Sequence, residues 1–384
     1  MNPYFDHNAT TPMSRAAREA WWEASERWWH NPSSLYREAG TTKRLLEDAR
    51  EELADLLGID LPERVIFTGG ATESNQAVMR YAVEAATPGS MAMISEIEHP
   101  SLREPALREF GQKRIEEISV SGKGAVDADE IEERLRQSSG TVALVSVMAA
   151  NNETGVMQPW QAVATHCRSA GVGFHCDAAQ WIGKLPASQI GAACDFVTGS
   201  AHKFGGPKGV GVLTVRDGVT LAPLVLGGGQ ERERRSGTHN VGGIVALAVA
   251  LAETDAERPS ECARLAALRD RLVDGLRAAV DGIVETVPRD RKVAGSAHVC
   301  IEGVESESML FLLDEAEVCA SAASACASGA MDPSHVLAAM GVDRALAAGA
   351  LRMSLGRTTT AADVDRAVDV VADAVVRLRG VRAR

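Results

Sequence analysis

The sequence has none of the patterns that are typical of a membrane, disulfide-bonded or zinc-binding protein. No run of about 18 apolar residues is free of charges and helix breakers, and the first residues contain neither a basic nor an apolar leader segment. The seven cysteines are irregularly spaced and include no CxxC pair, which argues against a disulfide framework and a metal site. We therefore expect a cytoplasmic chain with reduced thiols, no membrane partner and no metal.

Basic residues are too few for a broad nucleic-acid-binding surface. The chain has 40 lysines and arginines against 52 aspartates and glutamates, which gives a net charge of −12. Binding to a phosphate backbone needs clustered basic residues on one face, and the one dense run is Arg232, Arg234 and Arg235. A solvated face is the more common explanation of such a run. We expect no direct contact with nucleic acid.

The sequence does contain the pattern of an α/β protein. Its 384 residues exceed the usual size of one hydrophobic core and predict two domains. Between about residues 15 and 255, short apolar runs alternate with amphipathic stretches, which is typical of βαβ units around a mostly parallel sheet. The predicted strands are 65–68, 91–95, 142–148, 173–177, 196–200 and 211–215, and the predicted helices include 41–57, 74–84, 127–137 and 161–170.

The pattern changes at Pro259. A long helix is predicted over 261–280, and short strands such as 297–301, the loop SAASACASGAMDPS and a terminal helix over 361–378 follow it. We expect a large domain over 15–255. The remaining residues, 1–14 and 256–384, are expected to form a smaller α+β domain.

The most informative segment is SAHKFGGPKGVG, which places Lys203 directly after a predicted strand. Open α/β sheets bind their ligands at strand ends. A lysine that burial or its neighbours keep deprotonated can form an imine with an aldehyde cofactor, and Ser200 and His202 could donate to a phosphate. A surface lysine in a turn is the alternative for this segment taken alone.

Two other strand ends favour a cofactor with a pyridine ring and a phosphate. Asp177 ends the predicted strand GVGFHCDAAQ, where a carboxylate can pair with a protonated pyridine nitrogen; a helix cap is its alternative role. TGGATESN follows a strand and opens a helix, so its amides and the Thr72 hydroxyl could hold a phosphate at the positive helix end. This segment is neither a Walker motif nor GxGxxG. The combination predicts pyridoxal 5′-phosphate (PLP).

These segments closely resemble the group I, NifS/IscS-like cysteine desulfurases of the class V aminotransferase superfamily. The resemblance extends over nearly the whole chain and includes DHNATTP, NPSSLYREAG, FTGGATESN, EHPS, NNETGVMQP, HCDAAQ, SAHKFGGPKGVG, RRSGTHN, SACASGAMDPSHVL and LRMSLGR. It implies the PLP-dependent transferase fold type I, L-cysteine as substrate and a homodimer.

The resemblance also implies which residues bind the cofactor. Lys203 would be the Schiff-base lysine, Asp177 the partner of the pyridine nitrogen, and Gln180 the donor to the ring hydroxyl oxygen. The residues around the phosphate would be Ala71, Thr72, Ser200, His202 and, reaching in from the neighbouring subunit, Thr238.

Four further residues would act on the substrate side. By the resemblance, His99 would stack over the ring and serve as an acid or base, and Asn152 would contact the side of the ring and the substrate. Arg352 would clamp the substrate carboxylate with help from Asn31, a bidentate role that lysine performs poorly. Taken alone, His99 could equally be a loop histidine and Arg352 a structural ion pair.

Cys326 separates desulfuration from other PLP reactions. It lies in SACASG, where small residues and Gly329 predict an exposed, flexible loop in which a thiol can move. The resemblance implies that its thiolate takes sulfur from L-cysteine as a persulfide, that alanine is released, and that a protein acceptor then receives the sulfur. The other six cysteines fit buried thiols, and Cys319 is the alternative reactive one.

Several alternatives stay open at this point. A selenocysteine or cysteine-sulfinate lyase of the same fold would need no protein thiol, and a non-catalytic sulfur-relay platform would need no chemistry at all. The sulfur could serve iron–sulfur cluster assembly, tRNA thiolation, DNA phosphorothioation or a biosynthetic pathway. Relatives that serve the general iron–sulfur scaffold often continue past the last helix, whereas this chain ends at RLRGVRAR, so a dedicated acceptor is a further alternative.

Overall fold

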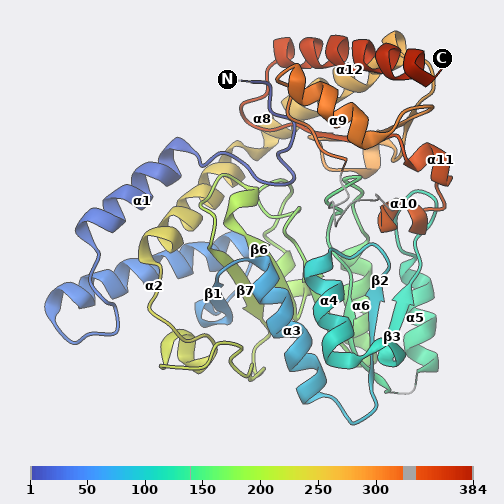
Figure 1. Cartoon of the computed structure of the whole chain (residues 1–384). Coiled ribbons are helices and arrows are strands. Elements are labelled where there is room, and N and C mark those ends of the chain that lie inside the picture. The colour runs from blue at the N-terminus through green and yellow to red at the C-terminus, as the bar shows by residue number, and fades with distance from the viewer. Residues whose placement is uncertain (1, 139, 323–333, 383–384) are drawn as a thin grey trace.

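The computed structural model describes residues 2–138, 140–322 and 334–382, and Cys326 lies outside them. Within these residues the chain forms a seven-stranded sheet with helices around it and a separate three-stranded sheet (Figure 1). None of the helices described there combines the length and the apolar character that crossing a membrane requires.

The large sheet has the strand order β1-β7-β6-β5-β4-β2-β3. Strands β2 to β6 pair in parallel, whereas β7 runs antiparallel to both β1 and β6. The prediction of an α/β fold with a mostly parallel central sheet is therefore confirmed. The strands are β1 Val65–Thr68, β2 Met91–Ser95, β3 Ile115–Ile118, β4 Val142–Ser146, β5 Gly173–Asp177, β6 Phe196–Ser200 and β7 Gly211–Val215.

Both faces of this sheet are covered, which explains why most positions of its central strands are apolar or buried. Val145 and Val197 belong to the core on one face, whereas their neighbours Leu144 and Phe196 belong to the core on the other face. Successive side chains of a strand point to opposite faces, so both sets of positions must be apolar.

The helices around the large sheet follow the predicted order, with some shifted ends. The sequence predicts a start at Thr41 for α2, but the helix begins at Arg37. The Thr41 hydroxyl donates to the carbonyl of Arg37 inside the helix at 3.4 Å, so it is not a cap. These helices are α2 Arg37–Leu57, α3 Ala71–Ala85, α4 Pro100–Phe110, α5 Ala128–Gln137, α6 Trp160–Ala170 and α7 Ile190–Ala193.

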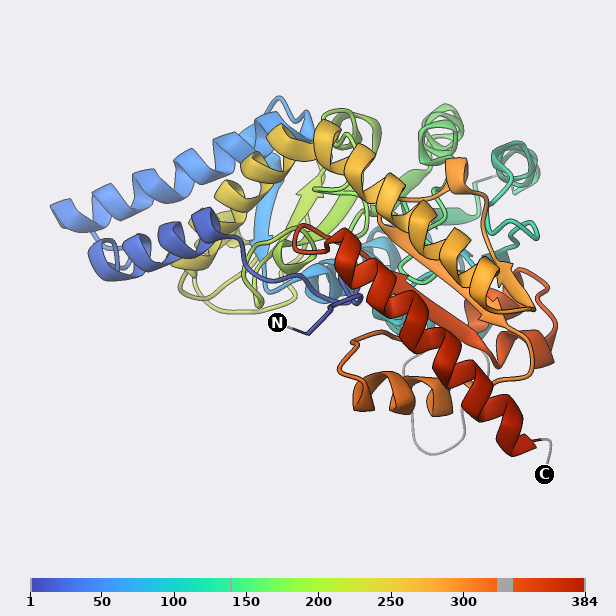
Figure 2. The ribbon, with the colours of Figure 1, turned by 90° about the horizontal axis from the view of Figure 1, so that it is seen from above.

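One helix, α8 (Val241–Ala279), runs past both sheets (Figure 2). The predicted start at 261 is wrong, because Asn240 caps the helix 20 residues earlier by accepting from the Gly243 amide. Pro259 lies inside α8, where it removes one backbone donor without ending the helix. The first half of α8 packs against α2 and against α1 (Arg15–Arg27), which the sequence did not predict, and α12 (Ala361–Arg382) also packs against α8.

The small sheet is antiparallel, in the order β10-β9-β8, and has its own hydrophobic core. The first residues of the chain belong to it, because Phe5 is fully buried in that core and Tyr4 and Asp6 form bridges with Cys319 and Ser354. The elements of this part are β8 Ile283–Glu285, β9 Ser296–Ile301, α9 Ser306–Glu315, α10 His335–Ala339, α11 Arg344–Ala347 and β10 Ala350–Ser354.

The segment that follows Asp6 crosses from the small sheet to the large one. The Thr11 amide donates to the carbonyl of His202 at 2.8 Å, and the Ser14 amide donates to the carbonyl of Gly205 at 2.8 Å. Residues 7–11 therefore pass directly over the turn that contains Lys203.

Candidate active site

The ends of β5 and β6 bring the first predicted site residues to one edge of the large sheet. Asp177 is the last residue of β5 and pairs in parallel with Thr198 of β6. Ser200 ends β6, and Lys203 lies in the single helical turn that follows it. Carboxyl ends of adjacent parallel strands lie at the same edge of a sheet, which is where such folds bind ligands.

Asp177 is held as a buried hydrogen-bond acceptor. Its Oδ2 accepts from Nδ2 of Asn75 at 2.8 Å, and its Oδ1 accepts from the Ala179 amide at 3.0 Å. Oδ1 of Asn75 in turn accepts from the Thr198 hydroxyl at 2.8 Å, which fixes the orientation of the amide. Sequence reasoning missed Asn75, although it lies within FTGGATESN.

Lys203 is held by two backbone carbonyls of the crossing segment. Its Nζ donates to the oxygens of Asn8 at 2.8 Å and of Ala9 at 2.9 Å. Burial, and then the charge of Arg352, lowers the pKa of Lys203 to about 8, although Asp177 and Asp6 oppose the shift. Two acceptors satisfy both N–H groups of a neutral amine and leave its lone pair available for an electrophile.

The residues predicted to hold a phosphate lie where β6 meets the start of α3. The Ser200 hydroxyl accepts from the Ala71 amide at 2.7 Å, and Thr72 is exposed in the first helical turn. Gly70 has a φ of 148°, and a Cβ there would lie 3.3 Å from the Ser200 oxygen. His202 Nδ1 lies 3.1 Å from the Thr10 hydroxyl. Burial, and then neighbouring lysines, lowers the pKa of His202 to about 4, so its ring is neutral.

Arg352 comes to the site from the middle of β10 and is 5% exposed. Its Nη2 donates to Oδ1 of Asp6 at 2.6 Å and its Nη1 to the carbonyl of Asn152 at 3.0 Å. Its Nε is buried and has no hydrogen-bond partner among the described residues. This donor is available to a carboxylate ligand, while Asn152 contributes its backbone to the site.

His99 lies at the start of α4, where its Nδ1 accepts from the Ser101 amide at 3.1 Å. The proton of the neutral ring is therefore on Nε2. Partial desolvation lowers the pKa of His99. The negative charge of Asp177 opposes this shift, whereas the positive charges of Lys203 and Arg352 add to it. His99 thus responds to the charges of all three, which places these residues around one site.

A cavity of about 890 Å³ lies on the other side of the crossing segment, against α8. Lys203, Asn8, Lys184 and Cys262 are among its lining residues. His7 also lines it, is 3% exposed, and has no partner for either ring nitrogen among the described residues. Lys203 therefore borders the cavity as well as the segment of residues 7–11.

Two predicted residues, Asn31 and Thr238, lie apart from this group. Asn31 is in the loop between α1 and α2, and its Oδ1 accepts from the Ser33 amide at 3.0 Å. Figure 1 shows this loop at the outer end of the α1–α2 hairpin, away from the small sheet that contains Arg352. Thr238 is exposed in the loop that precedes α8. A single chain therefore does not bring either residue to Lys203.

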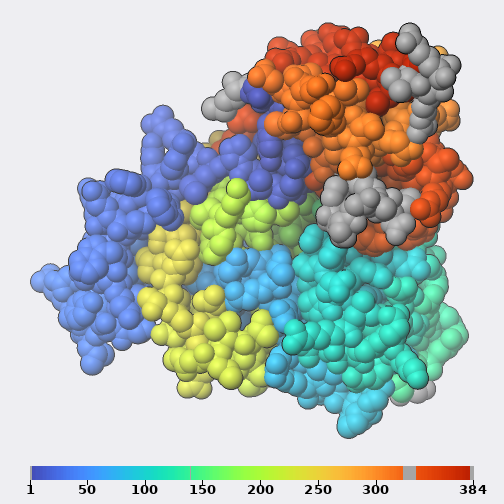
Figure 3. All heavy atoms as spheres, viewed as in Figure 1, coloured from blue at the N-terminus to red at the C-terminus, as the bar shows by residue number. Residues whose placement is uncertain are grey.

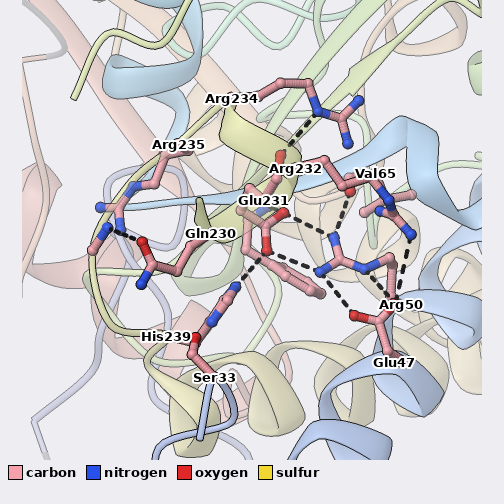
Figure 4. A network of polar contacts seen from close by, with 12 residues as sticks. Ser33, Glu47, Arg50, Val65, Gln230, Glu231, Arg232, Arg234, Arg235 and His239 are labelled. Carbon is pink, nitrogen blue, oxygen red and sulfur yellow. Dashed lines mark hydrogen bonds and ion pairs between the residues drawn. The ribbon is translucent and has the colours of Figure 1, made fainter. Parts of the chain in front are cut away.

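A buried ion pair fixes the loop that contains Thr238 (Figure 4). The two carboxylate oxygens of Glu231 accept from Nη1 and Nη2 of Arg50 at 2.8 and 2.9 Å. His239 Nε2 lies 2.8 Å from Glu231, and the Phe67 amide donates to it at 3.0 Å. This anchor holds Glu231, Arg232 and Glu233 at φ values of 49°, 55° and 65°, a conformation that costs on the order of 1–2 kcal/mol per residue.

The basic run in this loop is only partly solvated. Arg232 is exposed, but the Arg235 guanidinium donates to Glu73 at 2.9 Å, and Arg234 Nε donates to the carbonyl of Glu231 at 3.1 Å. Glu73 lies in the first turn of α3, next to Thr72. The expectation of a simple solvated face is therefore wrong for Arg234 and Arg235, which fasten the loop.

Comparison with known proteins agrees with this geometry. The model of the class-V aminotransferase family matches residues 3–367. An IscS-like cysteine desulfurase of Mycobacterium tuberculosis is 42% identical over 98% of this chain and 97% of its own. A solved NifS-like protein has a TM-score of 0.90 and 33% identity over 98% of this chain and 100% of its own. A structure described as SspA in complex with cysteine has a TM-score of 0.75 and 28% identity over 92% and 98%.

The chain belongs to the class-V aminotransferase family, in its NifS/IscS-like cysteine desulfurase group. It therefore has PLP-dependent transferase fold type I, and PLP is its cofactor.

The residues of this aminotransferase-family site fit PLP. The carboxylate of Asp177 could pair with the pyridine nitrogen, and the amine of Lys203 could react with the aldehyde. The glycine at position 70 leaves an open approach to Ser200 and to the first turn of α3, where a phosphate meets a positive helix end. Nε of Arg352, which has no partner among the described residues, could donate to a carboxylate.

Proposed function

We propose that this chain desulfurates L-cysteine to L-alanine and carries the sulfur as a persulfide on Cys326. The observation that supports this most directly is the grouping of Lys203, Asp177, His99 and Arg352 around one site in a chain of the NifS/IscS-like group. A solved relative is described as containing cysteine. L-Cysteine is therefore the substrate that we assign.

Each residue of the group has a separate part in the reaction. Arg352 would bind the cysteine carboxylate with Nε and orient the amino acid over the site. PLP, when bound, supplies an electron sink for the carbon next to that carboxylate. The amine of Lys203, once released, would accept and return the proton at that carbon, and Nε2 of His99 would exchange a proton on the facing side. Asp177 would keep the pyridine nitrogen protonated.

The described cysteines support Cys326 as the acceptor of the sulfur. Cys167, Cys176, Cys194 and Cys300 are buried, and burial raises the pKa of Cys167 and Cys300 to about 12. Such thiols do not form the reactive thiolate at neutral pH. Of the rest, Cys262 and Cys319 are partly exposed.

The test compares Cys326→Ser with Cys319→Ser. Cys326→Ser should retain the absorbance of bound PLP but release no sulfide from L-cysteine in the presence of a reductant, whereas Cys319→Ser should release it as the wild type does. Undiminished turnover in Cys326→Ser would overturn the persulfide assignment. Alanine release from selenocysteine and cysteine sulfinate in the same variants distinguishes a lyase, which needs no protein thiol. A protein that stays colourless with added PLP would indicate a relay platform instead.

We also propose that the active form is a homodimer in which Thr238 reaches the phosphate of the neighbouring subunit. Thr238 is exposed on a loop that is held rigidly from within. Large apolar side chains are exposed on the nearby hairpin, among them Trp22 at 63%, Trp29 at 71% and Leu35 at 103%. Figure 3 shows this hairpin projecting from the body of the molecule. A second copy of the chain would cover these side chains. We further propose that the dimer passes the sulfur to a protein acceptor.

A further inference from the structure

Lys184 is a second lysine beside the Schiff-base lysine, and none of the roles above includes it. It follows β5 and lines the same cavity as Lys203. Its Nζ donates to Oδ1 of Asn8 at 2.8 Å and to Oε1 of Gln180 at 2.5 Å. Both acceptors are neutral amide oxygens. Asn8 therefore binds both lysines, Lys203 through its backbone and Lys184 through its side chain.

The contact with Lys184 determines which end of the Gln180 amide faces the site. When Lys184 is protonated it can only donate, so the atom beside it is the amide oxygen. The Gln180 nitrogen is then turned to the carbonyl oxygen of Asn8 at 2.8 Å, the same oxygen that accepts from Nζ of Lys203. Gln180 consequently presents a donor to the neighbourhood of the Schiff base, where the family role of this residue requires one.

Asn8 connects Lys184 to the rest of the site through its hydrogen bonds. Asn8 is 3% exposed, and its Nδ2 donates to the carbonyl of Asn152 at 3.2 Å and to the Ser296 hydroxyl at 3.1 Å. With Oδ1 bound to Lys184, every polar atom of this side chain has a partner. The backbone carbonyl that holds Lys203 is therefore fixed in place.

Lys184 also brings a second positive charge close to Lys203. Burial, and then the charges of Lys203 and Arg352, lowers the pKa of Lys184 to about 7. The interaction between two such amines is mutual, because each protonated group disfavours a positive charge on the other. Below about pH 7, where Lys184 is mostly charged, a nitrogen at position 203 is therefore harder to protonate.

We propose that Lys184 is a positioning residue for the Schiff-base lysine, which orients Gln180 and Asn8 and whose charge favours the unprotonated nitrogen at Lys203. The proposal rests on PLP binding at Lys203. Arginine at position 184 would keep the charge and the donors, whereas methionine would keep only a side chain of similar length.

The experiment is a pH titration of the visible absorbance of the holoenzyme without substrate. The protonated and unprotonated Schiff base absorb differently, so the midpoint reports the protonation of the nitrogen at Lys203. Removal of a nearby like charge should raise this midpoint by about one pH unit in Lys184→Met, and Lys184→Arg should match the wild type. If Lys184→Met does not fold, Lys184→Gln also removes the charge and should show the same upward shift.

Lys43→Met is the matched control, because Lys43 is exposed on α2 and should leave the midpoint unchanged. A merely structural role of Lys184 would lower the melting temperature without moving the midpoint, and that result would overturn the inference. A wild-type protein that develops no visible absorbance with PLP would contradict the cofactor site itself. The two failures are therefore distinguishable.

Discussion

Two residues near the candidate site, the partly buried Lys203 and the buried Glu98, have pKa values shifted toward their neutral forms. Burial is the first cause in both cases. It lowers the pKa of Lys203 to about 8, and together with the charge of Asp177 it raises the pKa of Glu98 to about 8. A neutral amine is nucleophilic, and a neutral Glu98 places no second negative charge beside Asp177.

Replacement of Lys203 tests the cofactor attachment. Lys203→Ala with added PLP should lose the absorbance band of the lysine imine, because no amine remains to react with the aldehyde. The absorbance spectrum measures this, and far-UV circular dichroism checks the fold. Lys208→Ala, in the same loop but exposed, should retain the band. An unchanged band in Lys203→Ala would place the cofactor lysine elsewhere.

The pKa of Glu98 predicts a pH-dependent stability. Because its folded pKa is raised from 4.5 to about 8, its contribution to stability is full below pH 4.5 and is lost as the pH rises toward 8. Glu98→Gln cannot ionise. From about pH 6 to pH 8, its free energy of unfolding relative to that of the wild type should therefore increase by about 2 kcal/mol. Urea unfolding at both pH values measures this gain. The exposed control variant Glu104→Gln should show no such increase. If Glu98→Gln also showed no increase, Glu98 would be ionised and the predicted pKa shift would be wrong.

At this scale the sequence indicated candidate residues that lie next to strand ends, and it missed residues whose contacts are distant in the chain. Lys203, Asp177 and Ser200 directly follow or end strands, so apolar runs locate them. Asn75 and Asn8 were missed because their partners are 102 and 195 positions away in the chain. No local pattern indicates such a pairing.

At the scale of elements, the loop before α8 depends on one buried ion pair. Burial alone would raise the pKa of Glu231, but hydrogen bonds from Arg50 and His239 overcome this and lower it to about 2. The pair holds three successive residues in left-handed conformations. The sequence indicated only a basic run here, because the partner, Arg50, lies on α2.

Removal of the Glu231 charge should loosen this loop. Glu231→Gln leaves the buried Arg50 with only the partly exposed Glu47 as a counter-ion and should lower the free energy of unfolding by about 3 kcal/mol. Because the folded pKa is depressed, the contribution of Glu231 is present above pH 4.5 and is lost as the pH falls toward 2. Urea unfolding at neutral pH measures the loss, which should shrink toward pH 2. Glu233→Gln, at an exposed position, is the control. If Glu231→Gln were as stable as this control, the ion pair would contribute nothing to stability.

Most strands and several helix ends could also be predicted at this scale. Five of the predicted strands have the observed bounds, and that of β4 is two residues too long. Strand β3 was missed because its sequence, IEEI, contains two glutamates at an edge of the sheet. The prediction of α8 was wrong because Pro259 was taken as a boundary, although a long helix packed on both sides tolerates a missing hydrogen bond.

At the scale of the whole molecule, α8 joins the cores of both sheets. Leu247 and Leu251 belong to the core of the large sheet, and Leu272 and Leu276 belong to that of the small one. The proposed domain boundary at 255 falls within this helix. We keep the division into 15–255 and 1–14 with 256–384 as a proposal, with α8 shared between the two parts.

The proposed homodimer predicts a change in mass. Leu35→Asp and Trp22→Ser together should convert a dimer of about twice 40.6 kDa into a monomer, because a charge and a hydroxyl replace apolar surface that a second copy would cover. Light scattering after gel filtration measures the mass. Thr238→Val should leave the mass unchanged but weaken PLP binding, and Val376→Ser, an exposed apolar position on α12, should change neither. A wild-type monomer would contradict the proposal.

The crossing of the first residues between the two sheets has a consequence for synthesis. Phe5 is buried in a core whose strands β9 and β10 end at residues 301 and 354, so its partners leave the ribosome late. The carbonyls of Asn8 and Ala9, which hold Lys203, follow this anchor directly. The large sheet can fold while the chain is still being made, but Lys203 reaches its final setting only after β10 has been synthesised. We therefore expect nascent chains shorter than about 355 residues to bind PLP poorly.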